Sequence, residues 1–152
     1  MLLIAYDGSD HAKAAIEAAA KLMPGADAVV VTVWERYIDG LARAGAVGIG
    51  GIADDAGADF DKHFEAHAQR MASEGAAAAN ARGLKATPRT EAGPGAPAAT
   101  ILNVADHLGA DAIVLGSRGH GRISALLLGS TSNQVLHHAA RPVLVVPGPA
   151  DD

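Results

Sequence analysis

The sequence predicts an α/β fold, an open, doubly wound parallel sheet of five strands with helices on both faces. Short apolar runs alternate with helical patterns along the 152 residues. These runs are continuously apolar, which is typical of strands buried on both faces of a parallel sheet. The first strand, helix and second strand also fit within about 35 residues, as in a right-handed βαβ unit. We expect one domain over residues 1–148 and a frayed acidic tail over 149–152.

The first half of the chain begins with an apolar strand at residues 2–6. Ser9 or Asp10 can cap the helix that follows, and Pro24-Gly25 is expected to stop it. The apolar stripe of this helix is expected to consist of Ala14, Ala15, Ala18 and Leu22. A second strand is predicted at 28–34. The pattern then breaks between 35 and about 55, where the Gly-rich stretch 40–51 indicates either a flexible connector or a ligand lid.

A long helix is predicted at 59–82, with a buried side made of Phe60, Phe64, Met71 and Ala78. A third strand at 84–92 precedes a helix at 96–108, which has Pro97 in its first turn. The inward residues of that helix are expected to be Ile101, Val104 and Leu108. The remaining elements are predicted as a strand at 112–115, a helix at 130–139 and a strand at 141–147.

Composition excludes several classes of function. The chain has no cysteine, so disulfides and thiolate metal sites are excluded and a reducing cytoplasm is the expected location. A formal net charge of −5 argues against nucleic-acid binding, which needs a basic face. No apolar run reaches membrane-spanning length, and the first strand is not preceded by a basic leader, so we expect no membrane association.

The glycines that follow the fourth strand are the strongest chemical signal. This strand ends in Gly116-Ser117-Arg118-Gly119, and Gly129 stands directly before the last helix. Ligands of open α/β sheets lie outside the carboxyl ends of the strands, and a helix N-terminus attracts anions. Gly116 and Gly119 would let the backbone approach a ligand or adopt positive φ. Gly129 would let phosphate oxygens reach the amides and hydroxyls of Ser130, Thr131 and Ser132. Alternatively, these glycines only make turns.

The spacing Gly-x2-Gly-x9-Gly-Ser at Gly116, Gly119, Gly129 and Ser130 resembles the ATP-binding branch of the universal stress proteins. The opening Tyr6-Asp7-Gly8-Ser9, the helix start at Pro97-Ala98 and the run Arg141-Pro142-Val143-Leu144-Val145-Val146-Pro147 are similar to that family too. The resemblance covers nearly the whole chain except the Gly-rich stretch 40–51. It implies a sheet in the order 3-2-1-4-5, ATP at its carboxyl edge, and a homodimer. In that order the last strand is an edge, so Val143–Val146 would pair the two copies.

The resemblance also assigns roles to individual residues. It implies that Asp7 contacts the nucleoside and that the Val33 backbone reads adenine. It places Leu115 and Gly116 beside the ligand and Arg118 and Gly119 at its sugar-phosphate region. The phosphates would lie against Gly129, Ser130, Thr131 and Ser132. From the residues alone, Asp7 is equally interpretable as a helix-capping carboxylate.

Other residue patterns in the sequence are weaker signals of function. The chain has neither a P-loop nor a dinucleotide-binding glycine motif. His63 and His67 stand one helical turn apart, but Phe64 occupies the position of the glutamate of a zinc protease, so we interpret them as a polar helix margin. His137-His138 suit a helix C-terminus. The segment after Gly119 contains three polar residues that could contact phosphates or simply be exposed: His120, Arg122 and Ser124.

Three hypotheses for function follow. The first is a regulatory module of the stress response that binds ATP, with Mg²⁺ or Mn²⁺, and changes its partners or stability with occupancy. The second is a slow ATPase or phosphotransferase that uses Asp7 and a divalent ion, although no base is evident. The third is a structural dimer whose site is empty or holds another adenine nucleotide, such as a cyclic one.

Overall fold

The computed structural model describes residues 1–45, 54–119 and 128–149. Three of the possible phosphate contacts, His120, Arg122 and Ser124, lie outside these residues. So do residues 46–51 of the Gly-rich stretch and residues 150–152 of the expected tail.

Five parallel strands form one sheet in the order β3-β2-β1-β4-β5. They are β1 (Leu2–Ala5), β2 (Asp27–Trp34), β3 (Lys85–Ala92), β4 (Ala112–Gly116) and β5 (Val143–Val146). The central strand is β1, whose Leu2 pairs with Ala28 on one side and Ala112 on the other. The predicted fold class and the strand order implied by the resemblance are both confirmed.

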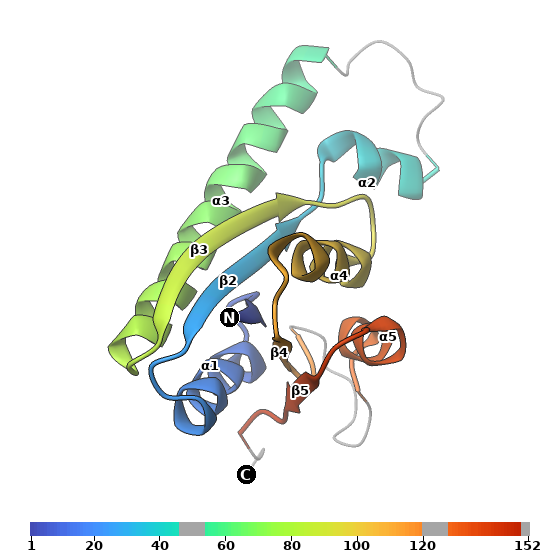
Figure 1. Cartoon of the computed structure of the whole chain (residues 1–152). Helices are drawn as coiled ribbons and strands as arrows, with labels where there is room; N and C mark the ends of the chain where they lie inside the picture. Colours follow the sequence, from blue (N-terminus) through green and yellow to red (C-terminus); the bar gives the residue numbers. More distant parts are fainter. Residues whose placement is uncertain (46–53, 120–127, 150–152) are drawn as a thin grey trace.

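Helices cover both faces of the sheet (Figure 1). They are α1 (Asp10–Leu22), α2 (Tyr37–Arg43), α3 (Asp54–Ala81), α4 (Pro97–Leu108) and α5 (Ser130–His138). Successive strand residues point to opposite faces. Ile4 and Val30 therefore pack beneath α1 and α3, while Leu3 and Val31 pack beneath α4 and α5. These strand residues are at most 1% exposed, as continuous apolar runs in a parallel sheet require.

Two expectations about the segments on either side of β2 were wrong. The segment after β2 is not a featureless loop, because α2 lies within it. The buried face of α1 is rotated from the predicted stripe, and Leu22 is 62% exposed. The residues that α1 buries are Ala12, Ala15, Ile16, Ala19 and Ala20. Six of the thirteen residues of α1 are alanines, which lie on several sides of the helix, so the sequence defines the inward face poorly.

The long helix α3 begins at Asp54 and does not bury its phenylalanines. Phe60 and Phe64 are 48% and 45% exposed, respectively. The part of α3 that packs on the sheet uses Ala68, Ala72, Ala76 and Ala79, each at most 3% exposed. Figure 1 shows the N-terminal half of α3 extending beyond the strands toward α2. The phenylalanines lie on this extension, where no sheet is available to cover them.

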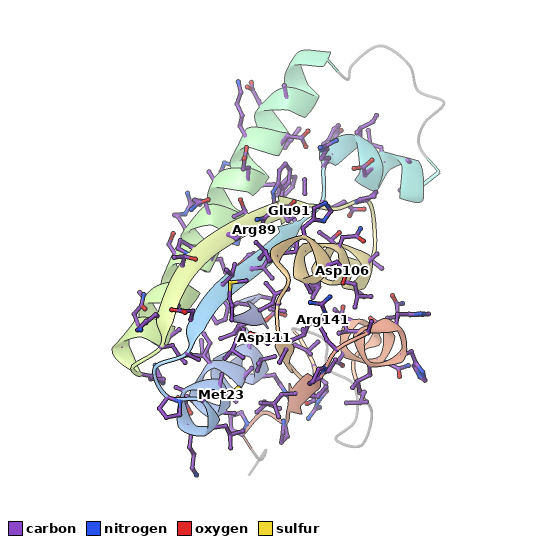
Figure 2. The ribbon with its side chains drawn as sticks, viewed as in Figure 1. Met23, Arg89, Glu91, Asp106, Asp111 and Arg141 are labelled. Carbon is purple, nitrogen blue, oxygen red and sulfur yellow. The ribbon has the colours of Figure 1, made fainter. Side chains whose placement is uncertain are left out.

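Arg141, just before β5, ties the C-terminal part of the chain to α4. Its guanidinium donates hydrogen bonds to the carbonyl oxygens of Ala105, at 2.9 Å, and Ala110. It also pairs with the carboxylate of Asp106 (Figure 2). The Ala105 carbonyl also accepts from the amide of Ala110 over 3.0 Å, and Ala110 lies two residues beyond the end of α4. The guanidinium therefore adds a charged donor to the C-terminal end of the helix, where the dipole favours a cation.

Candidate functional site

The carboxyl ends of β1, β2 and β4 meet the first turns of α4 and α5 around a cavity of about 290 Å³, here called the edge cavity. All ten residues proposed from the sequence line it: Asp7, Val33, Leu115, Gly116, Arg118, Gly119, Gly129, Ser130, Thr131 and Ser132. A five-stranded doubly wound sheet places the ends of its central strands at one edge, which is why residues more than 100 positions apart converge here.

The edge cavity has two chemically different sides. The side formed by β2 and α4 is apolar. Besides Val33, it contains three residues that were not proposed as site residues from the sequence: Val31, Pro97 and Ile101. The side formed by the end of β4 and the start of α5 carries glycines and hydroxyl groups. Asp7, at the end of β1, lies between them because β1 is the strand between β2 and β4. Pro97-Ala98 marked α4 as family-like, but only the fold shows that this helix start faces the cavity.

Hydrogen bonds join the two glycine-bearing segments. The amide of Gly129 donates to the carbonyl oxygen of Ser117 over 2.7 Å. The hydroxyl of Ser132 lies 2.8 Å from the same oxygen and 2.9 Å from the carbonyl oxygen of Gly129. Ser132 is 2% exposed, so its hydroxyl proton braces the start of α5. The amides of Ser130, Thr131 and Ser132 belong to the first helical turn, where N–H groups have no partner within the helix.

The glycines of this loop are explained by space rather than by backbone angle. Gly116, Gly119 and Gly129 all lack positive φ, so that part of the expectation was wrong. A β-carbon on Gly116 would stand 2.7 Å from the backbone carbonyl carbon of His11. One on Gly119 would stand 2.6 Å from Oδ2 of Asp7. Both distances are far inside van der Waals contact. Gly116 therefore excludes a side chain, because the backbone of His11 cannot move away, whereas a side chain at Gly119 would displace the carboxylate of Asp7.

Asp7 is held by the turn that precedes α1. Its Oδ1 accepts a hydrogen bond of 3.0 Å from the amide of Ser9. Ser9 in turn caps the helix, because its hydroxyl accepts from the amide of Ala12 over 3.2 Å. The capping role considered for Asp7 therefore belongs to Ser9. The carboxylate of Asp7 instead faces Gly119 across the edge cavity.

His11 is a supporting residue that the sequence did not indicate. Its Nδ1 lies 3.1 Å from Oγ of Ser117. Neither residue lines the edge cavity, so this hydrogen bond supports the loop from outside the cavity. The same loop is fixed to the sheet by the amide of Ser117, which donates to the carbonyl oxygen of Val146 over 2.7 Å.

Tyr6 lies at the base of the edge cavity and is 3% exposed. Its hydroxyl donates a hydrogen bond of 2.9 Å to Oε1 of Glu74 on α3. Burial, and next this hydrogen bond, raise the pKa of Tyr6 to about 12. Tyr6 is therefore a neutral structural group at physiological pH.

In the described structure the histidine pairs do not line the edge cavity, although His67 lines a neighbouring cavity. His63 and His67 are exposed on α3, and His137 and His138 are exposed in the last turn of α5. Over residues 1–45, 54–119 and 128–149, no three His, Asp or Glu side chains form a group that could hold a metal ion. Within the same residues, no helix is long and apolar enough to cross a membrane.

The model of the universal stress protein family matches residues 1–147. The chain belongs to this family. A universal stress protein of Thermus aquaticus, encoded in the 3′ region of a QAH/OAS sulfhydrylase, is 38% identical over 149 residues, covering 95% of this chain and 96% of the relative. Among solved structures, universal stress protein UspA from Lactobacillus plantarum matches with a TM-score of 0.71 at 24% identity, over 95% of both chains.

Two other solved universal stress proteins are nucleotide complexes. One is in complex with cAMP and matches with a TM-score of 0.60 at 23% identity, over 96% of this chain and 94% of the other. The other, from Archaeoglobus fulgidus, is in complex with dAMP and matches with a TM-score of 0.58 at 21% identity, over 95% of both chains. At these identities the likeness shows the shared fold.

Proposed function

We propose that this universal stress protein is a cytoplasmic regulatory module that binds ATP in the edge cavity. The observation that carries the proposal is the pairing, in one cavity, of an apolar side with a glycine-lined helix N-terminus. An adenine ring needs apolar surface, and a polyphosphate needs convergent amides and the positive end of a helix dipole. Adenine nucleotides bound to two proteins of the same fold support this assignment.

The two sides of the cavity set the expected orientation of the nucleotide. Adenine lies between Val31, Ile101 and Leu115, with the Val33 backbone available to its polar edge. The phosphates lie at Gly129 and the amides that follow it. Arg118 and Gly119 line the intervening sugar-phosphate region.

A divalent cation fits the residues present. Asp7 supplies a carboxylate beside the cavity, and Mg²⁺ typically binds one or two carboxylates together with substrate phosphates and water. Bound Mg²⁺ or Mn²⁺ would neutralise phosphate charge, which matters in a chain of net charge −5. Asp7 would hold the cation and, through its second oxygen, keep its hydrogen bond to the amide of Ser9.

Slow ATP hydrolysis or phosphotransfer is the second candidate. Among the residues that line the edge cavity in the described structure, Asp7 is the one carboxylate and no histidine contributes. Phosphoryl transfer needs both a metal-binding carboxylate and a group that positions the nucleophile. We therefore expect turnover that is absent or far below the roughly 1–100 per second of kinases. Rapid phosphate release that disappears in Asp7→Asn would favour the enzyme instead.

We also propose a homodimer through β5. This strand is at the edge of the sheet, and Val143, Leu144, Val145 and Val146 are all half-buried. An apolar edge strand left open invites pairing with other chains, and a twofold axis lets two copies cover each other.

Calorimetric titration of the protein with ATP, AMP and cAMP, each with and without Mg²⁺, tests the proposed function. We expect ATP with Mg²⁺ to bind with a Kd of about 1 μM, equivalent to roughly −8 kcal/mol. Absence of both heat and thermal stabilisation at millimolar ATP would contradict it. Tighter binding of cAMP than of ATP would instead support the cyclic-nucleotide hypothesis.

A further inference from the structure

A second cavity, of about 530 Å³, lies between the end of β2, helix α2 and helix α3. It is on the α3 side of the sheet, whereas α4 and its apolar contribution to the edge cavity are on the other side. Its volume falls in the roughly 300–1,000 Å³ range of small-molecule sites. We call it the aromatic cavity, because Trp34, Tyr37 and Phe64 line it.

Aromatic residues are concentrated at this cavity. The whole chain has five of them, one Trp, two Tyr and two Phe. Three line the cavity, and Phe60 stacks on Tyr37 with ring centroids 5.0 Å apart and an interplanar angle of 18°. The two cores that hold the sheet and helices together are almost entirely aliphatic, so packing of the fold does not account for this concentration. Exposed rings such as Phe64 gain by being covered, as a ligand in the cavity would do.

The charges at the aromatic cavity favour a cation. Asp7 and Glu35 both line it and are half-buried, whereas the two basic side chains that line it in the described structure, Arg36 and His67, are exposed. Glu35 lies beneath α2, with its Oε2 3.8 Å from the position of a β-carbon on Gly40. Aromatic ring faces also carry negative electrostatic potential, so rings and carboxylates attract the same kind of ligand.

From these observations we propose that the aromatic cavity binds a small amphipathic organic cation, with an apolar body among the rings and an amine or quaternary ammonium near Glu35 and Asp7. Asp7 and Val33 line both cavities, so this ligand would be a neighbour of a nucleotide in the edge cavity. The proposal does not depend on nucleotide binding, and its test uses no nucleotide.

Trp34 makes the test specific, because the chain has one tryptophan and it lines this cavity. Its fluorescence is recorded while the protein is titrated with 3-phenylpropylamine, 3-phenylpropan-1-ol or 3-phenylpropanoate. These probes share a body and differ in charge. We expect a saturable change with the amine, binding at least about tenfold weaker for the alcohol, and weaker still for the carboxylate. No saturable change with the amine, or carboxylate binding as tight as the amine, would overturn the proposal.

Two variants locate the probe. Glu35→Gln should abolish most of the preference for the amine over the alcohol while leaving alcohol binding unchanged. Phe64→Ala should weaken both probes by similar factors. Leu22→Ala, which shortens a residue that is 62% exposed on α1, is the matched surface control and should change neither. Thermal unfolding of each variant confirms that it is folded. Amine binding that is unaffected by both Glu35→Gln and Phe64→Ala would contradict the assignment.

Discussion

The hydroxyl of Ser132 lies 2.8 Å from the carbonyl oxygen of Ser117, fifteen residues earlier in the chain. The Gly129 amide donates to the same oxygen over 2.7 Å, so one carbonyl group joins the end of β4 to the start of α5. The phosphate-binding geometry proposed here depends on that junction, because it sets where the first amides of α5 lie relative to Gly116–Gly119.

Ser132→Ala should lower the free energy of unfolding by about 1 kcal/mol, since it removes a buried neutral hydrogen bond. It should also weaken ATP binding, because α5 loses a brace next to the proposed phosphate site. Ser130→Ala is the matched control. Ser130 is exposed, so its substitution should change stability by less than about 0.5 kcal/mol. Urea unfolding and calorimetry on both variants measure the difference. Equal stability of the two variants would show that the Ser132 bond contributes nothing.

Gly129→Val should weaken ATP binding by at least about a hundredfold, because a side chain would occupy the space proposed for phosphate oxygens. Two lost charge-assisted hydrogen bonds of about 1.5–3 kcal/mol each account for that factor. Gly129 has φ of −62°, an angle that valine adopts, but a β-carbon there would stand 3.3 Å from both Cα of Arg118 and the carbonyl oxygen of Ser117. We therefore expect a small local shift of the loop while the sheet remains folded. ATP affinity and urea unfolding are measured on the same preparation. Unchanged affinity in a folded variant would exclude this loop as the phosphate site.

Arg141→Ala should destabilise the protein by at least about 2 kcal/mol, because the backbone carbonyls of Ala105 and Ala110 lose a charged donor. The side chain of Arg141 is only 17% exposed, whereas that of its partner Asp106 is 66% exposed. Asp106→Asn should therefore cost less than about 1 kcal/mol, as surface ion pairs usually do. Chemical denaturation of both variants decides whether the carbonyl contacts or the ion pair matters. If Asp106→Asn destabilises the protein more than Arg141→Ala, the ion pair matters more than the carbonyl contacts.

Stability should fall as pH rises from about 10 to about 12. The pKa of Tyr6 is raised to about 12 in the folded protein from an unfolded value of 10.0, so the folded state holds the phenolic proton more tightly. The stabilisation is complete below the unfolded pKa and is lost as pH rises through the folded pKa. Tyr6→Phe should remove this part of the alkaline pH dependence. The difference in phenolate absorbance between the protein and Tyr6→Phe isolates the titration of Tyr6, which should be centred near pH 12. A difference centred near pH 10 would contradict the prediction.

Val145→Lys should convert the proposed homodimer to a monomer, because it places a charge on the edge strand β5. Light scattering at micromolar concentration measures the mass of both forms. A monomeric parent protein would rule out the dimer. If Val145→Lys remains a dimer, the interface does not lie at β5. The variant's circular dichroism spectrum and ATP affinity show whether the sheet and the edge cavity survive.

The sequence by itself determined the five strands, four of the five helices in the described structure, and the loop. Continuous apolar runs such as residues 28–34 identify buried strands, because a strand covered on both faces has no polar side. The glycine spacing from Gly116 to Gly129 identified the cavity-lining loop, since close backbone approach excludes other residues. The family resemblance added the strand order and named Asp7 and Val33, which no local pattern selects.

Only the tertiary structure decided which residues meet. The apolar side of the edge cavity, Val31 with Pro97 and Ile101, comes from a strand and a helix whose proximity depends on sheet order. The inward faces of α1 and α3 also required the structure, because alanine-rich helices present little difference between their sides. Phe60 and Phe64 appeared as core residues in the helical pattern, yet α3 extends past the sheet there. The hydrophobic periodicity of the sequence indicates which side chains share a helix face. Contact with a neighbouring helix or strand determines whether that face is buried.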